Sequence, residues 1–166
     1  MRIKDIALIG IMSAILVAVQ VALGFLPNIE LVSLLIIVYT LVFGRKALYI
    51  IYVFVAIEGM IYGVGLWWIN YLYIWTILFV IVMLLRKQHY TYIWAIVSGF
   101  YGLLFGALCA IPNIFISGFG SAVSYWIAGI PYDILHAAGN FVVCLLLFRP
   151  LYYVLDGIYK KTMNVN

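Results

Sequence analysis

Charged residues are scarce in this chain. Asp, Glu, Lys and Arg together make up 8% of its 166 residues, whereas 69% of the residues are apolar. A soluble domain carries about 25% charged and about 45–50% apolar residues. A soluble fold of this size leaves too much of its chain at the surface to hide such an excess. The composition therefore excludes an ordinary soluble domain and predicts an all-α integral membrane protein that crosses the bilayer several times.

Signatures of catalysis and of nucleotide binding are also lacking. The sequence contains no HExxH, no GxSxG and no phosphate-binding loop, and the glycines of segment 99–102 indicate helix packing. Cys109 and Cys144 lie inside apolar runs and have neither disulfide nor metal-site spacing. We therefore expect neither an enzyme nor a cofactor-binding protein, and any uphill transport has to draw its energy from a partner.

Linkers, low-complexity tracts and internal repeats are missing as well, so we expect one compact transmembrane domain over residues 1–166. Six apolar stretches are present, and most reach the roughly 20 residues that a spanning helix needs, although the second is short. They cover residues 6–26, 29–43, 47–66, 68–85, 91–116 and 126–155, the last with a bend near Pro131. The sequence thus predicts a bundle of six transmembrane helices.

The distribution of cations supports six spans. Every Lys and Arg lies at a chain end, in the second–third turn or in the fourth–fifth turn, and the other three connections have none. The cations are Arg2, Lys4, Arg45, Lys46, Arg86, Lys87, Arg149, Lys160 and Lys161. Because cytoplasmic loops are enriched in Lys and Arg, this pattern predicts that both termini are cytoplasmic. The net charge of +4 is then explained by cations that lie next to anionic lipid headgroups, and it does not indicate nucleic-acid binding.

Polar residues gather in the half of the bundle away from these cations. The residues at this depth are Asn28, Glu30, Glu58, Asn70, Asn113, Asp133, His136 and Asn140. Ionisable side chains inside a membrane segment are costly and usually face a cavity or a partner. The cluster therefore predicts a substrate pocket that opens outward, and the absence of a polar path through the other half argues against a channel. One outer histidine is too few for a transition-metal site.

One helical face carries three of these residues. Positions 133, 136 and 140 fall within about 60° of one another on an α-helix, so Asp133, His136 and Asn140 can point into one cavity. The alternative is that Asp133 and His136 satisfy each other or neighbouring backbone as a helix-packing pair. The sequence leaves both interpretations open.

The segment 67–75 (WWINYLYIW) is rich in aromatic residues. It fits an aromatic belt at the membrane surface, and it also fits a stacking wall for a flat ligand. We expect it to serve both purposes, with Trp67, Asn70 and Tyr71 in the pocket and Trp68 in the belt alone. Glycines in the connections 63–67 and 117–130 are expected to let these loops, with loop 27–30, close over the ligand.

Small residues recur every fourth position in the first helix, at Gly10, Ala14, Ala18 and Ala22. This spacing lets another helix approach closely. It fits packing within the bundle, and it also fits a docking face for a separate membrane subunit.

Several segments of the chain resemble the substrate-binding subunits (S components) of energy-coupling factor transporters. The segments are Ala14-xxx-Ala18, 26–33 (LPNIELVS), 43–47 (FGRKA), 129–140 (GIPYDILHAAGN) and 149–151 (RPL). The resemblance implies capture of a vitamin or related micronutrient at a bacterial plasma membrane. It also implies that Ala14 and Ala18 contact a transmembrane coupling subunit, which works with two ATPase subunits, and that Asn28 and Glu30 line the pocket.

Two other functions remain open on the sequence. A membrane scaffold, like the small bundle protein of the bacterial cell-shape machinery, would use the alanines of the first helix and bind no ligand. It leaves Glu58, Asp133 and His136 with no role beyond packing. A membrane-embedded enzyme is disfavoured by the missing catalytic residues.

Overall fold

The computed structural model describes residues 3–26, 28–88 and 90–164, and within these ranges it is helical with no strand. Arg2, one of the predicted cytoplasmic cations, and Pro27, in the first outer turn, lie outside the described residues. The six helices are α1 Ile3–Leu23, α2 Val32–Phe43, α3 Lys46–Tyr62, α4 Leu66–Leu85, α5 Thr91–Ser117 and α6 Phe119–Asn164. The six predicted apolar stretches thus correspond to six helices.

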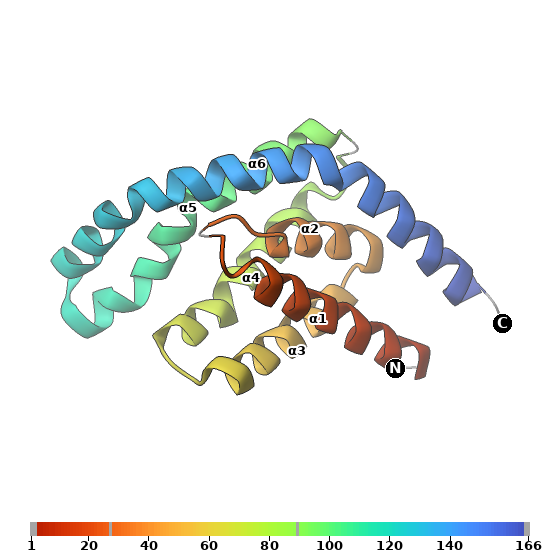
Figure 1. The fold of residues 1–166 in the computed structure, drawn as a ribbon, viewed down its shortest axis with the longest axis horizontal. Helices are drawn as coiled ribbons and strands as arrows, with labels where there is room; N and C mark the ends of the chain where they lie inside the picture. The colour runs from red at the N-terminus through yellow and green to blue at the C-terminus, as the bar shows by residue number, and fades with distance from the viewer. Residues whose placement is uncertain (1–2, 27, 89, 165–166) are drawn as a thin grey trace.

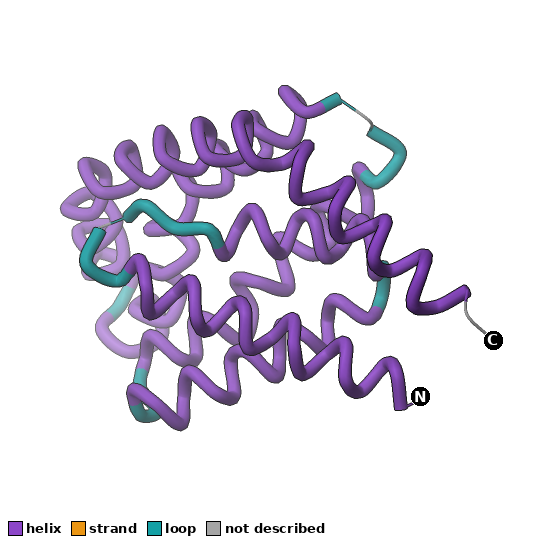
Figure 2. The backbone as a smooth tube through the Cα atoms, turned by 45° about the vertical axis from the view of Figure 1, so that its right-hand side comes forward, coloured by secondary structure: helices purple, strands orange, loops and turns teal. Residues whose placement is uncertain are grey.

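Successive helices run in opposite directions, so the two ends of the chain lie at the same end of the molecule (Figure 1). The α5–α6 pair forms a long hairpin along one side of the molecule, and α2 and α4 pack against it (Figures 1 and 2). Helix α2 is the most enclosed element, with every residue from 32 to 40 buried. This central position explains its largely apolar sequence, because a helix surrounded by protein needs no polar face. Its two hydroxyl residues, Ser33 and Thr40, are buried as well.

Four helices, α1, α4, α5 and α6, are long and apolar enough to cross a membrane. Helix α2 has 12 residues and spans about 18 Å, which is short of a hydrocarbon core of about 30 Å. Its short length is compatible with a membrane protein because its backbone groups are bonded within the helix and its surroundings are protein.

Helices α5 and α6 approach closely at glycines of α5. A Cβ atom placed at Gly102 would lie 3.0 Å from the backbone of His136, and one at Gly99 would lie 3.1 Å from the Cβ of Phe141. Side chains at these positions would push the helices apart. The prediction that segment 99–102 packs helices is confirmed.

Pro112 lies inside α5 and shapes its contact with α4. Proline has no backbone N–H, so the carbonyl of Leu108, four residues earlier, loses its intrahelical donor. The Tyr73 hydroxyl of α4 donates to this carbonyl at 2.6 Å. A side chain from a neighbouring helix thus satisfies the backbone group that the proline leaves free.

Polar residues of three helices meet where the chain ends lie. Lys46 Nζ donates to Asp5 Oδ1 at 2.7 Å and to the Tyr159 hydroxyl at 3.1 Å, and Lys4 Nζ donates to the Thr162 carbonyl at 3.3 Å. We call these five residues the terminal clasp. They connect the starts of α1 and α3 to the last turns of α6.

Two local expectations are wrong. The connection expected at 117–130 is reduced to Gly118, because α5 ends at Ser117 and α6 begins at Phe119 and continues as one helix for 46 residues. Trp68 is not a membrane-belt residue alone, because its indole N–H donates to the Val55 carbonyl at 2.9 Å. Its ring also fills the space beside Gly59 on α3, where a Cβ atom would lie 2.5 Å from Trp68 Nε1.

Candidate functional site

A cavity of ≈ 240 Å³ lies at the end of the molecule away from the terminal clasp, between α1, α4, α5, α6 and the segment before α2. We call it the Glu30 cavity. It is lined by Gln20, Leu23, Gly24, Leu26, Asn28, Ile29, Glu30, Tyr71, Trp75, Phe105 and His136. Four of the residues predicted to bind substrate, Asn28, Glu30, Tyr71 and His136, therefore line one cavity.

The segment 28–31 positions the acid of this cavity. Asn28 adopts a left-handed backbone conformation with φ of 59°, which asparagine tolerates better than most residues, and this turns the chain toward α2. Glu30 Oε2 then accepts a hydrogen bond from the Ser33 backbone N–H at 2.8 Å. The first N–H groups of a helix have no intrahelical acceptor and favour negative charge, so the start of α2 fixes the carboxylate.

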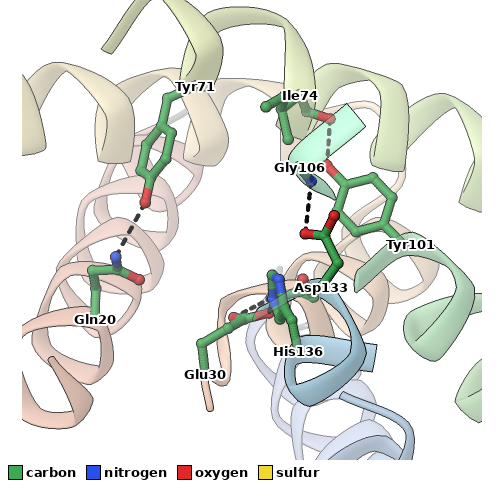
Figure 3. A network of polar contacts seen from close by, with 9 residues as sticks. Gln20, Glu30, Tyr71, Ile74, Tyr101, Gly106, Asp133 and His136 are labelled. Carbon is green, nitrogen blue, oxygen red and sulfur yellow. Dashed lines mark hydrogen bonds and ion pairs between the residues drawn. The ribbon is translucent and has the colours of Figure 1, made fainter. Parts of the chain in front are cut away.

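Glu30 also pairs with His136 across the cavity. Glu30 Oε1 lies 3.4 Å from His136 Nε2, although 106 residues separate the two in sequence (Figure 3). Burial by itself disfavours the charged carboxylate, but the hydrogen bonds from His136 and Ser33 outweigh burial and hold the pKa of Glu30 below its usual 4.5. The cavity thus contains a carboxylate that stays ionised at neutral pH.

Aromatic side chains form the opposite wall. The Tyr71 and Trp75 rings lie 5.4 Å apart, Trp75 and Phe105 lie 5.8 Å apart, and Phe105 meets the His136 ring edge-on at 4.9 Å. Gln20 Nε2 of α1 donates to the Tyr71 hydroxyl at 3.1 Å, which orients that ring (Figure 3). Aromatic walls with a few placed polar groups are typical of small-molecule sites.

One donor in this wall has no acceptor. Trp75 is 2% exposed, and its indole N–H makes no hydrogen bond to any described residue. Buried indole N–H groups usually find a partner, because a lost hydrogen bond is costly. The cavity therefore offers a negative charge and a wall of aromatic rings, which together fit a flat, polar molecule that carries a cationic or donor group.

Asp133 and Asn140 lie on α6 beside His136 but do not line the cavity. Asp133 Oδ1 accepts from the Gly106 backbone N–H at 2.9 Å, while Oδ2 has no partner among the described residues (Figure 3). The Nδ2 of Asn140 is likewise buried and unpaired in the described part of the chain. Asp133 and His136 thus bond to neighbouring elements and not to each other.

The other predicted residues lie farther from the cavity. The Trp67 ring meets the Tyr71 ring edge-on, with the two ring centres 5.4 Å apart. Asn70 Oδ1 lies 3.0 Å from the Tyr73 hydroxyl oxygen, Glu58 is 2% exposed on α3, and Asn113 is half-buried on α5. None of these four lines the Glu30 cavity.

Seven lining residues were not predicted to bind substrate, and three of them, Gln20, Trp75 and Phe105, have polar or aromatic side chains. Gln20 is the one amide in the first apolar stretch, and its polarity at that depth was a usable signal. Trp75 lies about two turns after Trp67 on α4, so the spacing of the aromatic run could have predicted that it lines the pocket. Phe105 gives no such signal, because nothing in sequence distinguishes it from other apolar residues of α5.

The small residues of α1 point away from the molecule. Gly10, Ala14, Ala18 and Ala22 are all exposed, and a Cβ atom added at Gly10 would meet nothing within 4 Å. Their spacing therefore does not serve packing among the described residues, and it leaves a smooth strip open along α1.

Among the described residues, no three His, Cys, Asp or Glu side chains gather closely enough to hold a metal ion. Compared with known proteins, the chain matches no family model, no curated protein and no solved structure.

Proposed function

We propose that this chain captures a small ring-containing micronutrient at a bacterial plasma membrane, as the substrate-binding subunit of an energy-coupling factor importer. The observation that carries the proposal is the Glu30 cavity. An ionised carboxylate paired with His136 and a row of aromatic rings converge there. A scaffold has no need for a carboxylate held in such a cavity, because taking a charge out of water costs stability.

The proposed topology places six helices in the membrane and both termini in the cytoplasm. The turns before α3 and α5 contain Arg45, Lys46, Arg86 and Lys87, and they lie at the same end of the molecule as both chain ends (Figure 1). A single cationic end is the arrangement that the positive-inside rule favours. The Glu30 cavity, at the other end, then faces outward.

The ligand we propose is a heteroaromatic vitamin or precursor with a cationic or hydrogen-bond donor group. Its ring would stack against Tyr71, Trp75 and Phe105, and its donor would face Glu30. The core between the cavity and the terminal clasp is filled by apolar side chains, among them Ile37, Phe54 and Leu78. Release into the cytoplasm therefore requires the whole subunit to reorient, which a partner has to drive.

The partner surface we propose is the strip formed by Gly10, Ala14, Ala18 and Ala22. Because these residues are exposed and small, a helix of a transmembrane coupling subunit can approach α1 closely. Two ATPase subunits bound to that coupling subunit would supply the energy.

Tryptophan fluorescence tests the proposal. Purified protein is titrated with vitamins, vitamin precursors and nucleobases, and we expect one class to quench saturably because Trp75 lines the cavity. Glu30→Gln should lower the affinity for that ligand about tenfold or more, since hydrogen bonds to charged groups contribute about 1.5–3 kcal/mol. Glu58→Gln is the matched control, because Glu58 is also a buried glutamate of the bundle but does not line the cavity.

Two outcomes would contradict the proposal. If folded protein responds to no compound of the panel, the membrane scaffold becomes the better explanation of the exposed strip on α1. If Glu58→Gln abolishes binding while Glu30→Gln does not, the ligand binds elsewhere in the bundle.

A further inference from the structure

A second cavity, of ≈ 400 Å³, opens at the end of the molecule where the chain termini lie. It is formed between α2, the turn from α4 to α5, and the last third of α6. We call it the Arg149 cavity. Its lining residues are Leu41, Arg86, Gln88, Tyr90, Thr91, Trp94, Phe148, Arg149, Tyr152 and Tyr153. It shares no residue with the Glu30 cavity.

Two guanidinium groups from distant parts of the chain line this cavity. Arg86 directly follows the last residue of α4. Arg149 lies on α6, where its guanidinium carbon is 5.7 Å from the centre of the Tyr153 ring. Neither arginine pairs with a carboxylate among the described residues. The chain has five acidic residues, Asp5, Glu30, Glu58, Asp133 and Asp156, and none of them lines the cavity. The cavity is therefore purely cationic.

Hydrogen-bond donors accompany the two charges. The N-terminus of α5 meets the cavity at Tyr90 and Thr91, and no side chain caps it in the described part of the chain. The N-terminus of a 27-residue helix favours anions. Trp94 also lines the cavity, but its indole N–H is fully buried. The two arginines and the N-terminus of α5 together define a site for an anion with several acceptor oxygens.

We propose that the Arg149 cavity binds the phosphodiester headgroup of an anionic phospholipid. The two guanidiniums suit phosphate oxygens, which arginine binds through paired hydrogen bonds. A lipid fits better than a free anion because the exposed side chains of Tyr90 and Tyr153 also line the cavity and offer an aromatic surface to the glycerol and upper acyl chains. Exposed tyrosines are typical of the membrane–water boundary.

The binding rests on the contacts of this cavity and is independent of the ligand of the Glu30 cavity. Only the choice of membrane leaflet from which the lipid comes rests on the proposed topology, which assigns this end of the molecule to the cytoplasmic side.

Native mass spectrometry of the delipidated, detergent-solubilised protein tests the proposal. The probes are short-chain phosphatidylglycerol, short-chain phosphatidylcholine and inorganic phosphate. We expect saturable binding of one phosphatidylglycerol, weaker binding of phosphatidylcholine, and little binding of phosphate. Arg86→Gln and Arg149→Gln should each lower phosphatidylglycerol affinity about fivefold, the effect of one cation beside an anionic headgroup.

Lys87→Gln is the matched control, because Lys87 is an exposed cation of the same turn that does not line the cavity. It should change the affinity less than twofold. An equal loss in Lys87→Gln and Arg86→Gln would show general surface attraction and overturn the proposal. Inorganic phosphate that binds as tightly as phosphatidylglycerol and displaces it would identify a free anion as the occupant, which also overturns it. Arg149→Lys, which keeps the charge, should retain part of the affinity and shows that the fold tolerates change at this position.

Discussion

The terminal clasp and the Glu30 cavity treat polar groups in opposite ways. In the terminal clasp, Lys46 contacts both Asp5 and Tyr159 at hydrogen-bond distance and ties three helices together. In the Glu30 cavity, the Glu30–His136 pair is longer, at 3.4 Å, and the nearby Trp75 N–H has no partner among the described residues. The first arrangement uses polar contacts for stability, whereas the second keeps polar groups available.

This difference distinguishes polar groups that stabilise the fold from polar groups that a ligand could bind. A buried polar group that is fully bonded stabilises the fold, whereas an unbonded one costs free energy unless something else binds it. The cavity end therefore carries a cost that a bound ligand would offset. Three perturbations test whether the two ends are independent.

The largest effect is expected from Gly102→Val. Its side chain would collide with the backbone of His136, push α5 from α6 and move His136 away from Glu30. Such overpacking costs about 1–3 kcal/mol, so both the melting temperature and ligand binding should fall. Gly129→Val is the control, since a side chain at Gly129 meets nothing within 4 Å. Equal losses in both variants would contradict close packing at Gly102.

A smaller effect is expected from Asp5→Asn, which breaks the terminal clasp. Asp5 is 6% exposed and Lys46 is partly exposed, so the loss should be about 1 kcal/mol, between the values for surface and buried charged pairs. Ligand affinity should not change. The comparison variant is Asp156→Asn, whose pair with Lys160 is exposed within one helix and should leave the melting temperature unaltered. A fall in ligand affinity in Asp5→Asn would show that the two ends are coupled.

The smallest effect concerns pH. The pKa of Glu30 lies below its usual 4.5 because the bonds from His136 and Ser33 outweigh burial. A lowered pKa means that this contribution to stability is complete above pH 4.5 and is lost as the pH falls through the folded-state value. Melting temperatures measured downward from pH 5.5 should show this loss in the wild type and lack it in Glu30→Gln. Identical curves for both proteins would argue against the pairing.

The sequence predicted the helices better than their junctions. Long apolar runs separated by cations or by glycine identified six helices, because a membrane-spanning helix leaves a strong compositional signal. The start of α6 was misplaced since Gly118, Gly120 and Gly129 resemble loop residues, yet only Gly118 has a left-handed backbone. Pairing with α5 keeps the rest of that segment helical, which local composition does not reveal.

The site was predicted in kind and only partly in detail. Depth along the helices placed Glu30 and His136 at one level, and the structure brings them together. Depth says nothing about the rotation of a helix, so Glu58 was grouped with them although it does not line the cavity. The aromatic wall depends on Phe105 of α5, whose place beside Trp75 follows from the close approach of helices and not from a motif.

The most direct test of the account is fluorine NMR of protein labelled with fluorotryptophan. The chain has five tryptophans, so each resonance can be assigned by one Trp→Phe variant. With a ligand identified by titration, the Trp75 resonance should shift, because Trp75 lines the Glu30 cavity. The Trp94 resonance, from the Arg149 cavity at the other end, should not. A shift at Trp94 with none at Trp75 would contradict the assignment of the Glu30 cavity as the capture site.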